Sequence, residues 1–528
     1  MKKIHQREVI EFRTAPNGAT FTAPDGSKTS VPAFQKADGL HYARYASAAV
    51  GTHACVTGDG AATTFEVVPY SGDNPLYKHG AVRAAANRRH LEHEDGTPFF
   101  YLADTWWMGL CKRLTSDGFA ELAADRVAKG FTAVHIVAGL YPDMHPFDPR
   151  GANDAGFPWD EKFTTLNPTY FDAADARIKR LVESGLAPVI VGCWGFFAKF
   201  AGVDVIKRHW EHLVARWAAY PVIWCAAGEA TMPFYTDPDL ASGKLSMQAL
   251  QELLRANWTD IAGHLRAYDP FRRLVTIHPT QNGHEQVNDE SLLDLDWLQT
   301  GHQGAISLQP TLKMVKAALD RRAMPVVNSE VCYEGIGGSS HADVQRYLFA
   351  SNVLLGCCGH GYAANGIWQV NSRAEPYGPS PHGASWGDTP WEDAMRLPGS
   401  AHIGHIKRFL MAFDWWRFEP HPEWVPNPCN CESLWGVFCA GIPNEARVIF
   451  KPWFGGCFWG DDDVLGLDGP YHAYYFDPIA GAWQALGLAT PDANGRWKSP
   501  RVKIFQDWLL ALSKKPLDCA GARPGGAS

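Results

Sequence analysis

The sequence predicts an α/β protein built on a (β/α)₈ TIM barrel, with a β-sandwich before it and a small β-domain after it. Three observations predict this architecture. The chain has 528 residues, which indicates two to four domains because single cores stop growing near about 250–300 residues. Eight short apolar segments alternate with helix-like segments in the middle of the chain. Both flanks are rich in β-forming residues that are punctuated by Gly, Pro and Asp.

Residues 1–85 are predicted to form the N-terminal β-sandwich. Short runs of β-forming residues are separated by turn residues, as is typical of small all-β domains. These runs are VIEFRT (9–14), LHYARYAS (40–47), THACVTG (52–58) and TTFEVVPY (63–70).

Residues 86–417 are predicted to form the barrel. Thr115 or Ser116 can cap a helix that ends at Gly130, and an apolar strand follows. This succession of helix, Gly or Pro stop and strand then repeats, and eight strands favour closure into a barrel. An open doubly wound sheet is the alternative, but no GxGxxG loop follows its first strand. The expected strands cover 97–107, 131–139, 187–195, 222–229, 273–279, 296–303, 324–330 and 362–370.

Residues 418–528 return to β character. Aromatic and β-branched runs such as ARVIFKPWFGGCF and GPYHAYYFDPIAGAW are broken by Gly, Pro and Asn. We therefore expect a second small β-domain, followed by a flexible tail, GARPGGAS.

Composition and charge restrict the possible partners. The net charge is −8 and Lys and Arg do not cluster, which argues against nucleic acid. No stretch approaches 18 consecutive apolar residues, so no membrane span is expected. The first residues, MKKIHQREVIEFRT, lack an apolar region after the lysines, and the twelve cysteines are scattered. These features favour a cytoplasmic protein, and a homo-oligomer remains open.

Two glutamates follow apolar strands on nearly opposite sides of the predicted barrel. Glu229 closes the fourth strand and Glu330 the seventh. Polar residues at the carboxyl ends of barrel strands are the usual candidates for catalysis. Glycosidases need two carboxyl groups, one to protonate the leaving oxygen and one to attack or to activate water. Glu229 and Glu330 are therefore the predicted catalytic residues, although either alone could equally be a structural acid.

Further polar and aromatic residues at the strand ends are candidates for binding a sugar. An aromatic ring suits the apolar face of a sugar, and the chain has 21 Trp. The histidines could instead be satisfied core residues, and the tryptophans could serve packing alone. The candidate substrate-binding residues are Asp104, Trp106, Trp107, His135, Trp194, His278, Gln303, Tyr333 and Trp368.

Other classes of protein fit the sequence less well. A barrel metallohydrolase usually has paired histidines near its first strand, and ADTWW offers none. The His pairs in HLEH (90–93) and HIGH (402–405) have no third ligand placed with them. We therefore expect no metal and no cofactor. A serine hydrolase would need a G-x-S-x-G elbow, which is absent. A non-catalytic carbohydrate-binding or scaffold protein remains an alternative.

Five motifs together resemble the bacterial apiosidase-like glycoside hydrolases: PFFYLADTWW, KGFTAVHIV, YPVIWCAAGE, MPVVNSEVCYEG and NGIWQ. The resemblance implies a (β/α)₈ barrel with flanking β-domains. It also implies Glu229 as proton donor, Glu330 as nucleophile, and Asp104 and Trp106 in the sugar subsite. The family pattern has Asp at the donor position, where this chain has Glu229. The extra methylene alters the pocket, so the resemblance implies glycoside hydrolysis without fixing apiose as the sugar.

Two long insertions predict a blind pocket. They cover residues 141–163 after the second strand and 369–393 after the eighth, and either Trp159 or Trp386 could reach over a bound sugar. We therefore expect an exo-acting, retaining enzyme that releases a terminal sugar from small oligosaccharides or glycosides. The sugar could be a furanose such as apiose, arabinofuranose or galactofuranose. Alternatively, these loops contact a neighbouring subunit.

Overall fold

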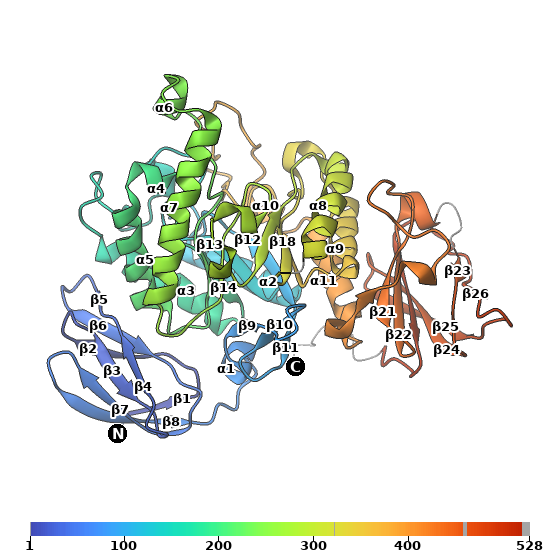
Figure 1. Cartoon of the computed structure of the whole chain (residues 1–528), viewed down its shortest axis with the longest axis horizontal. Coiled ribbons are helices and arrows are strands. Elements are labelled where there is room, and N and C mark those ends of the chain that lie inside the picture. Colours follow the sequence, from blue (N-terminus) through green and yellow to red (C-terminus); the bar gives the residue numbers. More distant parts are fainter. Residues whose placement is uncertain (1, 322, 458–461, 520–528) are drawn as a thin grey trace.

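The computed structural model describes residues 2–321, 323–457 and 462–519. Figure 1 shows the N-terminal strands, a central barrel and the C-terminal strands as three successive parts of one elongated molecule. The flexible tail expected at the C-terminus lies outside the described residues. The three-part division at 85/86 and 417/418 stays a prediction.

The N-terminal strands form two sheets that share one core, as predicted. Phe21, Tyr45 and Phe65 lie between the sheets, and the rings of Phe21 and Tyr45 stack with centroids 4.4 Å apart. The larger sheet has the order β1 (Lys2–His5), β8 (Ala62–Val68), β7 (Gly51–Thr57), β3 (Ala19–Thr22) and β4 (Lys28–Val31). The smaller has β2 (Ile10–Thr14), β6 (His41–Tyr45) and β5 (Phe34–Gln35).

A short helix and a three-stranded sheet connect this sandwich to the barrel. They are α1 (Pro75–His79), β9 (Val82–Ala84), β10 (Leu91–His93) and β11 (Pro98–Phe99). The expected domain boundary at 85/86 falls inside this small sheet.

Eight parallel strands form the barrel, which confirms the predicted fold class. Their side chains are almost all buried on both faces, as in other parallel sheets that are covered by helices. The strands are β12 (Tyr101–Thr105), β13 (Ala133–Val137), β14 (Ala187–Val191), β15 (Ile223–Cys225), β16 (Val275–Thr276), β17 (Asp296–Gln299), β18 (Val326–Glu330) and β19 (Gly359–Tyr362). The gap between β16 and β17 is bridged by Thr276 Oγ1, which donates to the Leu295 carbonyl at 3.0 Å.

Helices surround the barrel strands (Figure 1). Thr115 caps α2 by accepting a hydrogen bond from the Gly118 amide, as predicted. The longer helices are α2 (Ser116–Ala128), α3 (Pro168–Glu183), α5 (Val203–Trp217), α7 (Met247–Tyr268), α8 (Leu308–Arg321), α9 (Ala342–Leu355) and α11 (Pro398–Leu410). Short helices are α4 (Phe197–Phe200), α6 (Pro238–Ala241) and α10 (Trp391–Ala394). Between β16 and β17 the chain forms two 3₁₀ turns, Gly283–Gln286 and Glu290–Leu292.

All the barrel strands except the seventh, β18, end earlier than the sequence predicts, and the fourth, β15, ends at Cys225 and not at Glu229. The sixth was expected to reach residue 303, but β17 ends at Gln299, where its register to β18 shifts. The eighth was expected at 362–370, whereas β19 ends at Tyr362. Positive φ values at Gly301 (100°) and Gly366 (107°) turn the chain out of extended geometry after both strands. Gln303 and Trp368 therefore follow their strands instead of ending them.

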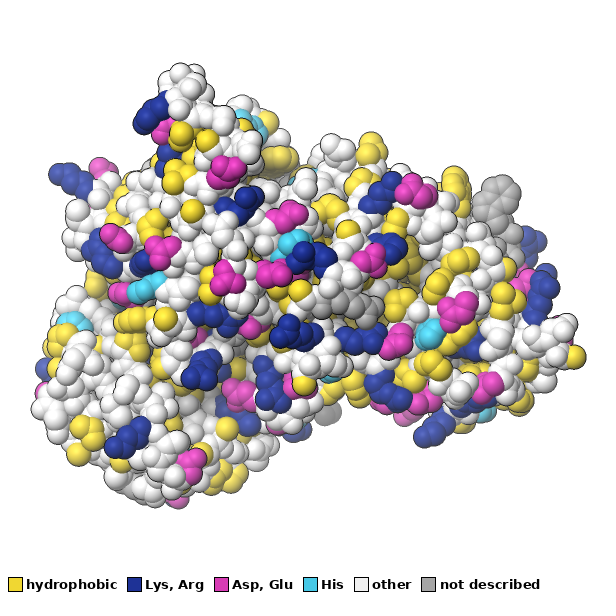
Figure 2. Space-filling view, viewed as in Figure 1, with side chains coloured by type: hydrophobic (Ala, Val, Ile, Leu, Met, Phe, Trp, Pro, Cys, Tyr) yellow, Lys and Arg dark blue, Asp and Glu magenta, His cyan; other side chains and the backbone are white. Residues whose placement is uncertain are grey.

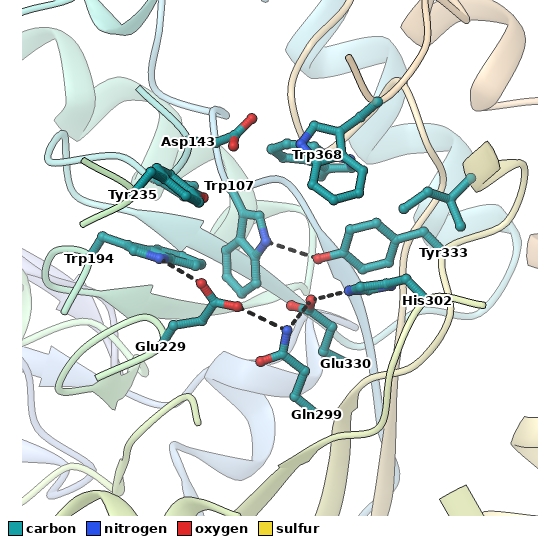
Figure 3. Close-up of a pocket in the computed structure, with 13 residues that line it drawn as sticks. Trp107, Asp143, Trp194, Glu229, Tyr235, Gln299, His302, Glu330, Tyr333 and Trp368 are labelled. Atoms are coloured by element: carbon teal, nitrogen blue, oxygen red, sulfur yellow. Dashed lines mark hydrogen bonds and ion pairs between the residues drawn. The ribbon is translucent and has the colours of Figure 1, made fainter. Parts of the chain in front are cut away.

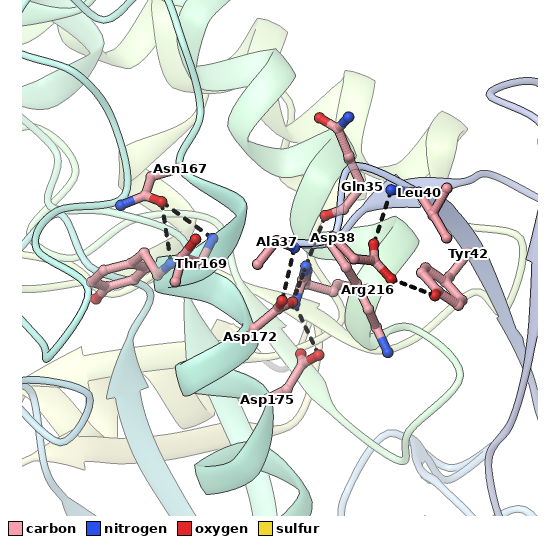
Figure 4. A network of polar contacts seen from close by, with 12 residues as sticks. Gln35, Ala37, Asp38, Leu40, Tyr42, Asn167, Thr169, Asp172, Asp175 and Arg216 are labelled. Carbon is pink, nitrogen blue, oxygen red and sulfur yellow. Dashed lines mark hydrogen bonds and ion pairs between the residues drawn. The ribbon is translucent and has the colours of Figure 1, made fainter.

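Buried charges join the N-terminal sheets to the barrel helices (Figure 4). Arg216 of α5 forms ion pairs with Asp172 and Asp175 of α3, each at 2.8 Å, and donates to the Gln35 carbonyl at 2.9 Å. Arg44 of β6 reaches Asp175 at 2.6 Å. Asp175 is thus shared by two arginines, one from each part of the molecule.

The C-terminal strands form a six-stranded sheet against α9. The order is β20 (Glu419–Pro420), β21 (Phe438–Ile442), β22 (Ala446–Lys451), β27 (Trp508–Ser513), β24 (Tyr471–Asp477) and β25 (Ala482–Ala489). A separate pair consists of β23 (Asp463–Val464) and β26 (Trp497–Lys498). Tyr347 packs on Phe438 with centroids 5.4 Å apart, and buried Arg346 pairs with Asp507 at 2.6 Å.

Acidic and basic side chains are interspersed over the face shown in Figure 2. None of the helices in the described part of the chain is long and apolar enough to cross a membrane.

Candidate active site

A pocket of about 120 Å³ lies where the carboxyl ends of the barrel strands meet (Figure 3). Its wall combines aromatic rings with three carboxyl groups. The lining residues are Trp107, Pro142, Asp143, Trp194, Glu229, Tyr235, Gln299, His302, Glu330, Tyr333, Ile336, Trp368 and Trp386.

Glu229 lies in the turn that follows β15. Its backbone has a positive φ of 43°, which is rare for a residue with a side chain. The preceding residue must be glycine, because a Cβ on Gly228 would lie 2.1 Å from the ring of Trp194. That close approach lets Trp194 Nε1 donate to Glu229 Oε2 at 3.0 Å. The turn thus carries the carboxylate out of the strand and into the pocket.

Glu330 is the last residue of β18 and is almost fully buried, with 5% of its surface exposed. His302 Nε2 lies 2.8 Å from Glu330 Oε1 in a hydrogen bond. His278 Nε2 lies 3.0 Å from Glu330 Oε2, although the ring is not aligned for a hydrogen bond. Two histidines therefore face the two oxygens of this carboxylate.

Gln299 connects the two glutamates. Its Nε2 donates to Glu229 Oε1 and to Glu330 Oε1, each at 3.0 Å (Figure 3). These two oxygens can therefore be no further apart than twice that distance. The carboxyl groups of retaining glycosidases lie roughly 5–5.5 Å apart and those of inverting enzymes roughly 6.5–9.5 Å.

The pKa values of the two glutamates are displaced in opposite directions. Burial, and then the charge of Glu330, raise the pKa of Glu229, although Gln299, His278 and Trp194 oppose the rise. Burial alone would raise the pKa of Glu330 too, but interactions with His278 and His302 outweigh it and hold that pKa well below its usual value. Of the two groups, Glu229 therefore keeps its proton to the higher pH, and Glu330 ionises at the lower pH.

Aromatic side chains from several loops form the walls. Trp107 and Trp194 meet edge to face with centroids 5.4 Å apart, and Trp107 Nε1 donates to Tyr333 Oη at 3.1 Å. Trp368 packs beside Tyr333, with centroids 6.2 Å apart. Of the residues predicted from the sequence, the structure brings together Glu229, Glu330, Trp107, Trp194, Tyr333 and Trp368 in the pocket lining.

Asp104 and Trp106 were expected in the sugar subsite, but they do not line the pocket. Both are fully buried and face the helical layer, where Asp104 pairs with Arg126 and accepts from Trp106 Nε1 at 2.7 Å. Successive side chains of a strand point to opposite sides, so Trp107 faces the pocket while Trp106 faces away.

His135, His278 and Gln303 also lie outside the lining. His135 is buried in the barrel beneath Trp107, within 2.7 Å of Tyr101 Oη, and burial lowers its pKa to about 3. His278 lies behind Glu330, with its Nε2 3.0 Å from Glu330 Oε2, and does not line the pocket itself. Gln303 is exposed, because β17 ends before it and the chain turns into the 3₁₀ segment Gly304–Ser307.

The sequence analysis missed four polar lining residues: Asp143, Tyr235, Gln299 and His302. Gln299 and His302 lie in the segment DWLQTGHQ, so an earlier end for that strand would have identified both. Of the two tryptophans expected to reach over a sugar, Trp386 lines the pocket. Trp159 is buried elsewhere, where its Nε1 donates to His209 at 3.2 Å.

The two long insertions contact each other, and each contributes a residue to the pocket wall, Asp143 from the first and Trp386 from the second. Arg150 of the first donates to the Tyr377 carbonyl of the second at 3.0 Å, and Tyr377 Oη donates to the Asp143 carbonyl at 3.1 Å. The insertions thus form a common wall on this side of the barrel.

Comparison with known proteins identifies a family. Residues 85–417 match the family described as "Apiosidase-like, catalytic domain". No curated protein matches the chain.

Solved structures share the fold at low identity. A glycoside hydrolase family 5 protein from Bacteroides vulgatus ATCC 8482 has a TM-score of 0.68 at 19% identity, over 84% of this chain and 95% of its own. A structure named "Glycoside hydrolase" has a TM-score of 0.67 at 19% identity, over 84% and 99%. A third, also from Bacteroides vulgatus ATCC 8482, has a TM-score of 0.67 at 16% identity over 97% and 100%. At these identities the likeness shows the fold alone.

Proposed function

The chain belongs to the apiosidase-like family of glycosidases, and from that premise we propose that it cleaves glycosides with Glu330 as nucleophile and Glu229 as acid and base. The hydrogen bonds from one amide nitrogen, Gln299 Nε2, to both carboxylates carry this proposal, because they keep the two groups close together.

The proposed reaction has two steps and retains the anomeric configuration. First, a Glu330 oxygen attacks the anomeric carbon, the bond to the leaving oxygen breaks, and the Glu229 proton moves to that oxygen. Glu229 then takes a proton from water, the water oxygen bonds to the anomeric carbon, and the bond to Glu330 breaks. The opposite displacement of the two pKa values supports these roles, since the first step needs a protonated Glu229 and an ionised Glu330.

We propose that the enzyme is exo-acting and releases one terminal neutral sugar, with a furanose such as apiose, arabinofuranose or galactofuranose as the first candidates. The pocket volume of about 120 Å³ is small beside the roughly 300–1,000 Å³ of most small-molecule sites, which suits a single sugar. The contact between the two insertions supports a closed end. The lining includes no Lys or Arg, and acidic sugars usually require such a cation.

The proposed substrates are small oligosaccharides or glycosides. The proposed location of the enzyme is the cytoplasm. Eleven cysteines in the described part of the chain are free thiols, which supports a reducing compartment.

A substrate screen tests the proposal. Aryl furanosides and pyranosides are offered to the wild type and to Glu330→Gln in parallel. We expect cleavage of at least one neutral glycoside by the wild type and a loss of about 1,000-fold or more in kcat/KM for the variant. Proton NMR of the first-formed sugar should show the anomer of the substrate. The inverted anomer would exclude Glu330 as nucleophile.

A further inference from the structure

Asp143 is a third carboxyl group in the pocket wall, and the proposed reaction does not use it. It belongs to the loop after β13, has a positive φ of 58°, and is 3% exposed. Figure 3 shows its carboxyl group on the other side of Trp107 and Trp194 from Gln299. In this view Asp143 lies across the pocket from Gln299, which bridges the two glutamates.

A directed chain of hydrogen bonds fixes one oxygen of Asp143. Trp386 Nε1 donates to Ser380 Oγ at 3.0 Å, and an indole N–H can only donate. The hydroxyl of Ser380 therefore directs its own proton to Asp143 Oδ2. Both partners come from the insertion after β19, so the two insertions together hold this carboxyl group.

The other oxygen, Oδ1, receives no hydrogen bond from a described residue. His382 Nε2 is 4.0 Å away, which is too far for a hydrogen bond. The Tyr235 hydroxyl approaches the carboxyl group closely enough to lower its pKa, but it does not reach the geometry of a hydrogen bond to Oδ1. A buried carboxylate oxygen without a donor is costly, and burial accordingly raises the pKa of Asp143. A hydroxyl donor supplied by a ligand would remove that cost.

The chemistry of the pocket identifies this donor. Its lining has several aromatic rings and three carboxyl groups but no Lys or Arg, so it suits neutral hydroxyl groups above an apolar ring face. We propose that Asp143 determines sugar specificity by accepting a hydrogen bond from a hydroxyl group of a neutral sugar, remote from the bond that is cleaved. This inference rests on the proposed glycosidase function for its identification of the ligand as a sugar.

Deoxyfluoro sugars test the inference, because fluorine can replace a hydroxyl group without being able to donate. The best aryl glycoside from the screen is compared with its deoxyfluoro analogues, one ring position at a time. For the wild type, one position remote from the anomeric carbon should show a loss of about 10- to 100-fold in kcat/KM beyond the others, as expected for a hydrogen bond to a charged group. In Asp143→Asn, kcat/KM for the parent glycoside should fall by a similar factor. The ratio between hydroxyl and fluoro substrates at that position should approach one.

Asp154→Asn is the matched control, because Asp154 lies exposed in the same insertion and outside the pocket lining. It should keep both the wild-type rate and the wild-type ratio. If Asp143→Asn behaves like this control, or keeps the wild-type ratio at every position, the inference is wrong. Should Asp143→Asn not fold, Ser380→Ala replaces it. That variant keeps the carboxyl group but loses its donor, and it should lower the hydroxyl-to-fluoro ratio in part; an unchanged ratio would contradict the inference.

A binding measurement separates this inference from the proposed function. Free neutral hexoses and pentoses, and their deoxyfluoro analogues, are titrated while the fluorescence of the pocket tryptophans is followed. Sugar binding by the wild type that is weakened about 10-fold or more in Asp143→Asn supports the inference even if no glycoside is cleaved. Cleavage of a glycoside with equal rates and equal sugar binding in Asp143→Asn overturns the inference and leaves the proposed function standing. If the wild type neither binds nor cleaves any of these sugars, both are wrong.

Discussion

Glu229 is held in a backbone conformation that costs a non-glycine residue about 1–3 kcal/mol. Neighbouring strands fix the turn, since the Gly228 amide donates to the Cys193 carbonyl at 2.9 Å and the Ala230 amide to the His278 carbonyl at 3.2 Å. The structure thus fixes the direction of one carboxylate at the expense of local strain.

Gly228→Ala should lower the activity, because it displaces the ring of Trp194. The new methyl group would occupy the place of the indole ring and break the hydrogen bond from Trp194 Nε1 to Glu229. That bond lowers the pKa of Glu229, so its loss should raise this pKa and move the basic limb of the pH–activity profile to higher pH. We expect a fall in kcat/KM of about 10-fold or more, as for the loss of one hydrogen bond to a charged group.

Gly263→Ala is the control for this prediction. Gly263 lies inside α7 with no atom near its added Cβ, and alanine is the better helix former by roughly 1 kcal/mol. That variant should be at least as stable as the wild type and equally active. Equal kinetics for both variants would show that Trp194 can move without consequence.

His302→Ala should change the acidic limb instead. His302 lowers the pKa of Glu330, and a carboxylate with a depressed pKa loses its charge only as the pH falls through that pKa. Removing the imidazole raises the pKa of Glu330, so activity should be lost at a higher pH than in the wild type. We expect kcat/KM near neutral pH to fall about tenfold, and kcat/KM measured across pH checks both effects. If the acidic limb of the variant coincides with that of the wild type, His302 does not lower the pKa of Glu330.

The sequence predicts the identities of residues in the pocket better than the faces they occupy. Glu229 and Glu330 were predicted because each comes at the end of an apolar segment. A carboxylate buried there would be costly, so its presence indicates that it reaches the rim of the barrel. Asp104 in β12 and Trp106 just after it satisfy the same rule but face the helical layer, and the alternation of strand side chains could have separated them from Trp107.

At the scale of elements, the strand ends decide which residues reach the pocket. The register shift between Leu298 and Gln299 places Gln299 opposite Glu330. Bulges of this kind leave little trace in the hydrophobic pattern, and the polar run QTGHQ is compatible with several strand ends. Asp143 and Tyr235 were missed for another reason, since they lie in the loops after β13 and β15, whose course depends on tertiary contacts.

The network between α3, α5 and the N-terminal sheet should contribute to stability and not to catalysis. Asp175 accepts hydrogen bonds from Arg44, Arg216 and Trp217 Nε1, and the two arginine side chains are 7% and 0% exposed. In Asp175→Asn, two buried arginines lose the carboxylate that they share. The free energy of unfolding should fall by about 2–3 kcal/mol, less than for a fully buried ion pair, because Asp175 itself is partly exposed. Thermal unfolding should therefore begin at a lower temperature, while kcat/KM at 25 °C stays unchanged.

Asp260→Asn provides the comparison for Asp175→Asn. Its ion pair with Lys207 is 2.7 Å long but 60% exposed at the carboxylate, so its removal should change stability by less than about 0.5 kcal/mol. Equal melting temperatures for the two variants would contradict a stabilising role of the buried network.

At the scale of the whole molecule, the two flanking β-regions are attached differently. Phe438, Val448 and Leu509 of the C-terminal sheet belong to the same hydrophobic core as the barrel. Alternate residues of the same strands, including Ile449 and Leu510, form a second core on the outer face. The N-terminal sandwich has a core of its own around Phe21 and Phe65, against which Phe271 of the barrel packs. The Arg44–Asp175 ion pair and the hydrogen bond from Arg216 to the Gln35 carbonyl also join the sandwich to the barrel.

This difference predicts the order of unfolding in the intact chain. A shared apolar core couples two regions strongly, whereas an interface of ion pairs is weakened by salt and by denaturant. In hydrogen exchange at increasing urea, the amides of β3 and β7 should therefore lose protection first, as one unit. Those of β22 and β27 should lose it together with β13 and β14 of the barrel. Added salt should lower the urea concentration at which the sandwich opens more than that at which the barrel opens. Salt screens the partly exposed carboxylates Asp172 and Asp175, which pair with Arg44 and Arg216. If β22 and β27 open before the barrel, the shared core does not couple the two regions, and the C-terminal sheet is an independent unit that only covers α9.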